Sequence, residues 1–163
     1  MAGRRRPART LSEELRVSRP FASSGVEAYL NVVRSAHQLQ AETQVVLRRE
    51  GLSVPQYNVL RILRGAGEDG LPCLGIGERM VARVPDVTRL IGRLEQAGLV
   101  TRERTPSDRR IVAVRITEEG LQRLARLERP VQDLHERQWA VLDEVERRTL
   151  IDLLTRARQR DDA

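Results

Sequence analysis

The stretch VPDVTRLIGRLEQAGLVTRERTPSDRRIVAVRIT, residues 84–117, begins with the pattern of an amphipathic helix. Apolar side chains recur in it every three or four residues, which places them on one helical face. They are Val87, Leu90, Ile91 and Leu94. Pro85 suits the first helical turn, where a missing N–H costs least, and Gly98 is the expected left-handed stop. The spacing therefore predicts a helix between Pro85 and Gly98.

The second half of the same stretch predicts a β-hairpin. Residues 100–104 and 111–116 read as two strands, and side chains alternate along the second one. The connecting TPSDRR, residues 105–110, has the proline and Ser-Asp pair typical of a turn. Arg109 and Arg110 then lie at or just after an exposed tip, where burial does not explain them. The hairpin is a candidate wing that reaches an anionic partner.

Helices are predicted on both sides of this stretch. Upstream, helical periodicity covers residues 25–49, a segment from residue 53 to the loop RGAGEDG, and residues 74–82. Downstream, Thr117 is expected to cap a long helix that is bent or interrupted near Pro130, and a final helix covers about residues 144–158. The predicted fold is mainly α with a small β-wing. It is a winged helix-turn-helix of order α-α-α-α-β-β-α-α, flanked by long helices. These helices carry more apolar surface than a lone winged domain needs, which favours a role in dimerisation.

Four segments follow from this pattern. Residues 1–24 form an Arg-rich N-terminal tail, predicted to be disordered apart from a short helical turn around Leu11 to Val17. Residues 25–52 form an N-terminal dimerisation helix, residues 53–117 the winged DNA-binding domain, and residues 118–160 the C-terminal dimerisation helices. The tail is either a solvated segment or an arm that adds phosphate contacts.

Composition favours a polyanionic partner. The net charge is +6 with a sequence pI of about 10.9, and all 29 basic residues are arginine. A GC-rich genome would also produce the arginine bias, so the positions of the arginines matter more than their number. With four aromatic residues in 163, base stacking on an RNA-recognition surface is a poor expectation.

Covalent and metal chemistry is not expected. A single cysteine, Cys73, excludes an intramolecular disulfide, and two separated histidines suggest neither a zinc site nor another cofactor. The N-terminus lacks the apolar core of a signal peptide, and no apolar run approaches membrane-spanning length. We therefore expect a cytoplasmic protein without a membrane partner.

The predicted fourth helix is the candidate reader of double-stranded DNA. A recognition helix enters the major groove with its N-terminal residues nearest the base edges, which favours Pro85, Asp86, Thr88 and Arg89. Arg89 would read a guanine edge or hold a phosphate, and Arg93, one turn later, is expected on the DNA backbone or in support of the helix. The alternative is an ordinary amphipathic helix with a solvated basic face.

The predicted wing tilts the balance toward DNA. An arginine inserted into the minor groove exploits its negative potential without reading a full base code, which suits Arg109 and Arg110. Asp108 is expected to orient an arginine or the turn backbone. Residues 83–115 contain eight arginines and four carboxylates, so the excess of positive charge lies in the segment expected to contact DNA.

These motifs resemble the MarR family of transcriptional regulators. The family's wing pattern is matched by Asp108 and Arg110 followed by Ile116-Thr117, with isoleucine where the family has leucine. VTRLIGRLEQAGLVTRERTPSDRR resembles the segment from recognition helix to wing, SVPQYNVLRIL the second helix, and ITEEG the entry to the fifth. The resemblance covers about residues 26–158, so the tail inherits nothing from it.

The resemblance implies a homodimer, built from the first helix and the last two, that binds a pseudo-palindromic operator, most commonly as a repressor. It also implies a small phenolic or lipophilic effector in a cleft between the dimerisation helices and the winged domain. His37, Tyr57 and Trp139 are candidates for that cleft, although such residues more often belong to the core. Some relatives sense peroxides through a first-helix cysteine. Cys73 precedes the third helix, which favours a structural or incidental cysteine.

Rival functions are weaker. The sequence has no nucleophile elbow, no phosphate-binding glycine loop and no metal constellation, so an enzyme is not expected. A non-specific architectural DNA-binding protein fits the charge, and differs from a regulator in lacking a large preference for specific over random DNA. A winged regulator of another family, PadR-like or ArsR-like, remains an alternative, the latter weakened by the missing metal ligands.

Overall fold

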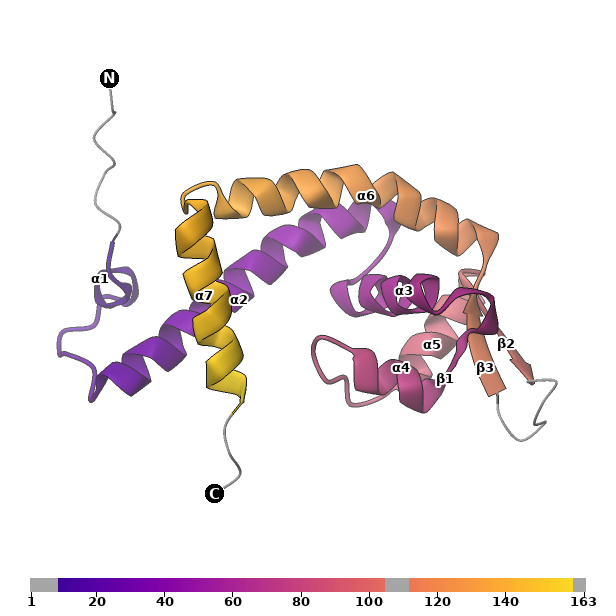
Figure 1. The fold of residues 1–163 in the computed structure, drawn as a ribbon, viewed down its shortest axis with the longest axis horizontal. Helices are drawn as coiled ribbons and strands as arrows, with labels where there is room; N and C mark the ends of the chain where they lie inside the picture. The colour runs from indigo at the N-terminus through magenta and orange to yellow at the C-terminus, as the bar shows by residue number, and fades with distance from the viewer. Residues whose placement is uncertain (1–8, 105–111, 160–163) are drawn as a thin grey trace. The chain divides into compact units, whose positions relative to one another are not determined.

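The computed structural model describes residues 9–104 and 112–159 (Figure 1). Its α-helices are α1 (Leu11–Leu15), α2 (Ser24–Leu47), α3 (Val54–Ala66), α4 (Cys73–Arg79), α5 (Val87–Gln96), α6 (Glu118–Trp139) and α7 (Glu144–Arg158). The structure also contains two 3-10 turns, η1 (Arg48–Glu50) and η2 (Gly67–Asp69). Its strands are β1 (Leu71–Pro72), β2 (Val100–Arg104) and β3 (Val112–Ile116). Within the described ranges, none of the helices is long and apolar enough to cross a bilayer.

The chain divides into two compact units, Met1–Ala41 and Glu42–Ala163. In the first unit, the short helical turn expected in the tail is present as α1. Thr10 caps it, and the Glu13 carboxylate accepts a hydrogen bond from the Thr10 backbone N–H. Glu14 pairs with Arg34 of α2 at 3.6 Å, and Leu11 is buried. Part of the Arg-rich segment is therefore ordered against α2.

The second unit contains a three-stranded antiparallel sheet of order β1-β3-β2. The predicted hairpin strands pair from Val100↔Ile116 to Arg104↔Val112. The sequence reading missed β1, in which Leu71 pairs with Val114. Two residues are too few to show an alternating pattern. The strand forms because Gly70, at φ 67°, turns the chain tightly against β3.

The predicted helix between Pro85 and Gly98 is present as α5, with one correction at its start. Asp86 is the N-cap, and its carboxylate accepts a 2.8 Å hydrogen bond from the Arg89 N–H. Pro85 therefore precedes the helix and does not occupy its first turn, because a side-chain cap one residue later fixes the boundary. At the other end Gly98 is left-handed (φ 71°), and Leu99 N–H returns to the Leu94 carbonyl, closing a Schellman motif.

Helix α6 begins at the predicted cap, where the Thr117 hydroxyl accepts from Gly120 N–H and donates to the Gly98 carbonyl at 2.7 Å. Of the bend or interruption expected near Pro130, the interruption is wrong, since α6 continues through Pro130 to Trp139. A proline inside a helix costs about 3 kcal/mol. Buried side chains on both sides of Pro130 offset that cost by anchoring each half of α6 in the same core. They are Leu124, Leu127, Val131 and Leu134.

The core of the second unit is wholly apolar among the described residues. Helix α3 contributes Val59, Leu60 and Leu63, and the predicted apolar stripe of α5 packs onto it. Leu90, Ile91 and Leu94 of that stripe are buried and Val87 is partly buried. The stripe fixes which faces of α5 remain available to solvent.

Candidate nucleic-acid interface

All five residues predicted to bring α5 to DNA are exposed. They are Pro85, Asp86, Thr88, Arg89 and Arg93. Asp86 is occupied by its cap hydrogen bond to the Arg89 backbone, so its first role is to start the helix. The side chains of Arg89 and Arg93 lie one turn apart on the exposed surface, and Gln96 follows them on the same face. The side chains of this stripe carry hydrogen-bond donors, which guanine edges and phosphates can accept from.

A neighbouring face of α5 is covered from the sheet, which the sequence reading did not anticipate. Arg102 of β2 donates from Nη2 to the Thr88 carbonyl at 3.1 Å. Its Nε lies 3.4 Å from a Glu95 carboxylate oxygen. Residues 88, 92 and 95 share this face, and Gly92 between the two contacts leaves room for the guanidinium. A strand arginine reaching back to a helix has no periodicity by which the sequence could reveal it.

The wing residues Asp108, Arg109 and Arg110 lie outside the described residues. The base of the hairpin is well defined. Arg115 of β3 donates from Nε to the Glu68 carbonyl at 2.6 Å and also pairs with Glu103 of β2. These contacts tie both hairpin strands to η2.

Cys73 lies half-buried at the start of α4, beside an open groove of about 730 Å³ between α4 and α5. Met80, Val84 and Val87 supply apolar walls, and Pro85 and Thr88, two of the residues predicted to approach DNA, also line the groove. Cys73 also packs against the apolar core.

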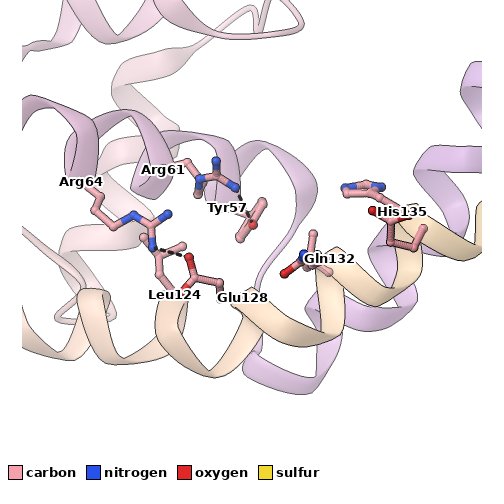
Figure 2. Close-up of a pocket in the computed structure, with 9 residues that line it drawn as sticks. Tyr57, Arg61, Arg64, Leu124, Glu128, Gln132 and His135 are labelled. Carbon is pink, nitrogen blue, oxygen red and sulfur yellow. Dashed lines mark hydrogen bonds and ion pairs between the residues drawn. The ribbon is translucent and has the colours of Figure 1, made fainter. Parts of the chain in front are cut away.

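A second cleft, of about 280 Å³, lies between α3 and α6 (Figure 2). Arg61 donates to the Tyr57 hydroxyl at 3.1 Å and lies 5.8 Å from the centre of its ring. Arg64 pairs with Glu128 across the cleft at 3.6 Å. The cleft combines an aromatic wall, two guanidinium groups and the imidazole of His135.

Of the three residues predicted for an effector cleft, Tyr57 lines the cleft between α3 and α6. Trp139, the last residue of α6, is half-buried and is not among the described lining residues. His37 is exposed on α2 in the first unit. The sequence reading missed His135, although its spacing from Leu124, Val131 and Gln132 on α6 places all four near one helical face.

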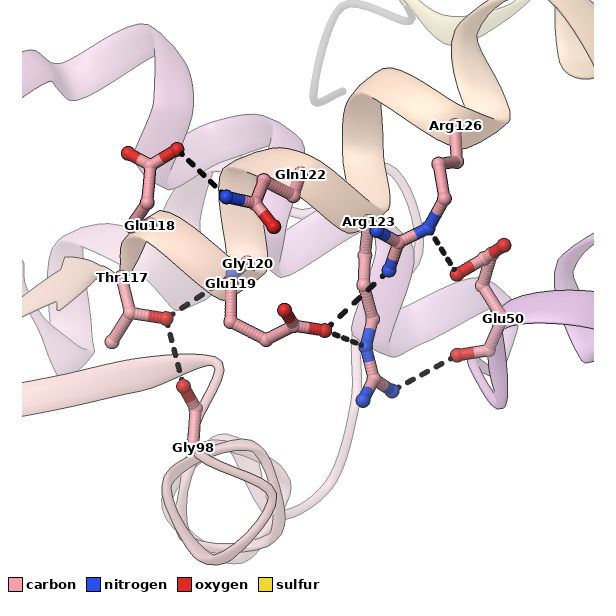
Figure 3. A network of polar contacts seen from close by, with 9 residues as sticks. All are labelled: Glu50, Gly98, Thr117, Glu118, Glu119, Gly120, Gln122, Arg123 and Arg126. Carbon is pink, nitrogen blue, oxygen red and sulfur yellow. Dashed lines mark hydrogen bonds and ion pairs between the residues drawn. The ribbon is translucent and has the colours of Figure 1, made fainter.

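A charged network ties η1 to the first turns of α6 (Figure 3). Arg123 donates to the Glu50 carbonyl at 3.1 Å and to Glu119 at 2.9 Å. Arg126 donates to the Glu50 carboxylate at 2.9 Å. The hydrogen bond from Arg123 lowers the pKa of Glu119, and that to Glu50 raises the pKa of Arg126. The network joins the end of α2 to the helix that begins at the wing.

A helix-turn-helix with an exposed basic second helix, an antiparallel hairpin and long outer helices defines the winged helix-turn-helix class of DNA-binding proteins. The model of the MarR family matches residues 52–112. A MarR transcription factor from Planctomyces limnophilus is 41% identical, with a TM-score of 0.64 over 83% of this chain and 98% of that one. The chain belongs to the MarR family.

Two further proteins show similarity. The HTH-type transcriptional repressor IacR of Pseudomonas putida is 33% identical over 101 residues, 62% of this chain and 59% of IacR. The PcaV regulator of Streptomyces coelicolor, solved in complex with its natural ligand, is 30% identical, with a TM-score of 0.63 over 75% of this chain and 87% of PcaV. MarR proteins are DNA-binding transcription regulators and not enzymes, so the PadR-like, ArsR-like and enzymatic alternatives no longer apply.

Proposed function

We propose that this regulator is a cytoplasmic repressor that binds a pseudo-palindromic operator as a homodimer and is released by a small effector. The exposed stripe of Arg89 and Arg93 on a firmly capped α5 carries the proposal. In this reading Pro85, Asp86 and Thr88 approach the groove with it. In the wing, Arg109 and Arg110 reach the adjacent minor groove, and Asp108 orients an arginine or the turn backbone. Repression is supported by the similar protein IacR, which is a transcriptional repressor.

Helix α7 supports the homodimer. None of its residues Glu144–Arg158, all of them described, is buried, yet Val145 is 74% and Ile151 59% exposed. Apolar side chains gathered on one surface helix indicate a partner. In the first unit, Tyr29 and Val33 of α2 are also exposed. A two-fold dimer would place the two copies of α5 about one DNA turn, roughly 34 Å, apart.

The cleft of Tyr57 is the proposed effector site. An aromatic side chain with hydrogen-bond donors around it suits a phenolic ring, and Arg61 and Arg64 suit an anionic substituent on that ring. PcaV was solved with its natural ligand, which supports a ligand site in this fold. His37 and Trp139 remain proposals for the same function.

The experiment that tests the proposal is equilibrium binding of the purified protein to its own promoter region and to random DNA of equal length, titrated across salt. A regulator prefers the promoter by on the order of a thousandfold or more, at dimer stoichiometry. Equal affinity with equally steep salt dependence would instead identify a non-specific architectural protein. In that case the wing would be an electrostatic clamp without sequence to read.

A further inference from the structure

Arg102 is placed unusually for a basic residue beside a DNA-reading helix. Its side chain is 28% exposed, and its Nε is buried without a hydrogen-bond partner among the residues that the structure describes. The guanidinium faces α5, where Nη2 bonds the Thr88 carbonyl and Nε faces Glu95. An arginine that served only to attract phosphate would keep its donors in solvent.

The two contacts grip α5 at both ends. Thr88 lies in its first turn and Glu95 in its last, seven residues apart on one face. The backbone of Arg102 is held in the sheet, because Arg102 pairs with Val114 in the β2–β3 ladder. Arg102 therefore joins the helix that meets the major groove to the hairpin that carries the wing.

We propose that Arg102 is a positioning residue that fixes the reading helix relative to the wing, and that it supports operator selectivity without itself contacting DNA. The proposal rests on the function proposed above. Base readout needs donors held to a fraction of an ångström, whereas phosphate attraction tolerates displacement. Loss of the contacts that Arg102 makes with Thr88 and Glu95 should thus reduce specific DNA binding far more than non-specific DNA binding.

The geometry requires an arginine and not merely a positive charge. Its planar fork reaches the Thr88 carbonyl and the Glu95 carboxylate together, which a single lysine ammonium at the end of a different stem does not reproduce. Arg102→Lys keeps the charge and removes this bridge. Arg104→Met is the matched control, because it removes a basic charge from the exposed end of the same strand.

The test uses the duplex that the wild-type protein enriches from a random pool, together with a random duplex of equal length. We measure affinity for both across salt for the wild type, Arg102→Lys, Arg102→Met and Arg104→Met. The ratio of selected to random affinity should fall by about tenfold in both Arg102 variants, the discrimination of one good base contact. Their salt slope on random DNA should be unchanged, and Arg104→Met should keep the ratio.

Several outcomes would overturn the proposal. Full selectivity in Arg102→Lys would mean that charge alone suffices, and a salt slope lowered by about one in Arg102→Met would mark a phosphate contact. A lower melting temperature with an unchanged ratio would show a purely structural role. If Arg102→Met fails to fold, Arg102→Lys and Glu95→Gln carry the test. In both variants the amide protons of α5 should also exchange faster than in the wild type. A wild-type protein that enriches no duplex would refute the proposed function itself.

Discussion

At the scale of single residues, the first turn of α5 combines a helix cap with an exposed arginine that is predicted to contact DNA. Asp86 uses its carboxylate to cap the helix through the Arg89 N–H, while the Arg89 side chain stays exposed. The cap thereby aims Arg89 from a fixed point on the backbone. Removing the side chain of Arg89 should cost recognition and leave the cap intact.

Arg89→Ala should weaken operator binding, by about 1–3 kcal/mol if the arginine reads a guanine edge. Binding to a set of single-base operator variants distinguishes the two roles. A changed base preference at one position assigns Arg89 to base readout, and uniform weakening assigns it to a phosphate. Arg129→Ala, at an exposed position of α6, is the control for charge loss. Unchanged binding in Arg89→Ala would remove this residue from the interface.

Two helical glycines have opposite surroundings. A methyl group at Gly120 would collide with the Leu99 carbonyl and lie 2.7 Å from Ile116 Cγ1, whereas one at Gly65 meets nothing within 4 Å. Gly120→Ala should therefore lower the free energy of unfolding by about 1–3 kcal/mol. Gly65→Ala should raise it by up to about 1 kcal/mol. Denaturant unfolding at one protein concentration measures both, and equal effects would contradict the close packing at Gly120.

At the scale of elements, the wing should act as an electrostatic contact. Arg110→Ala is expected to weaken operator binding and to lower the salt slope by about one unit if it removes one phosphate contact. The slope comes from binding isotherms collected across a salt series. An unchanged affinity and slope would show that the wing takes no part in binding.

The network at the start of α6 should make stability depend on acid. The pKa of Glu119 lies below its ordinary value of 4.5, chiefly because Arg123 donates a hydrogen bond to it. A lowered folded-state pKa stabilises the fold above the ordinary value, and this contribution disappears as the pH falls through the lowered pKa.

Glu119→Gln should therefore melt at a lower temperature than the wild type at neutral pH, with a difference that shrinks as the pH falls below 4.5. Melting curves across pH measure this. Glu118→Gln is the control in the same turn, since its carboxylate accepts from the neutral Gln122. A difference between Glu119→Gln and wild type that stays constant with pH would contradict the account.

The sequence predicted the elements that periodicity and end signals define, and missed those that depend on distant contacts. The stripe of Leu90, Ile91 and Leu94 and the stop at Gly98 followed from spacing alone. Strand β1 exists only because β3 is beside it. Likewise, α6 passes Pro130 because tertiary packing outweighs a local penalty.

The candidate site divides in the same way. Exposure of Arg89 and Arg93 followed from the helical pattern, because their positions lie off the apolar stripe. The grip of Arg102 on α5 and the meeting of Tyr57 with His135 join separate elements, and no local pattern encodes them.

At the scale of the whole molecule, the tail and α7 should differ in their effect on assembly. Deleting residues 1–24, which carry six arginines and two glutamates, should preserve the dimer. Ile151→Glu should weaken it, because a charge would replace an exposed apolar side chain of α7. Sedimentation measures both. A monomeric truncated chain would contradict the tail assignment, and a lowered salt slope on random DNA would identify the tail as a phosphate-binding arm.

Helix α5 has ten residues, and its apolar stripe turns four of them inward. The residues of α5 that face outward can read only a short DNA sequence of roughly three base pairs. Such a sequence recurs by chance on the order of every hundred base pairs in any genome. In the proposed homodimer, operator specificity therefore comes from two such short sequences at a fixed spacing. Readout of the full operator needs both protomers, whereas each protomer alone still contacts phosphates. Dissociation of the dimer would abolish operator specificity and leave non-specific DNA binding.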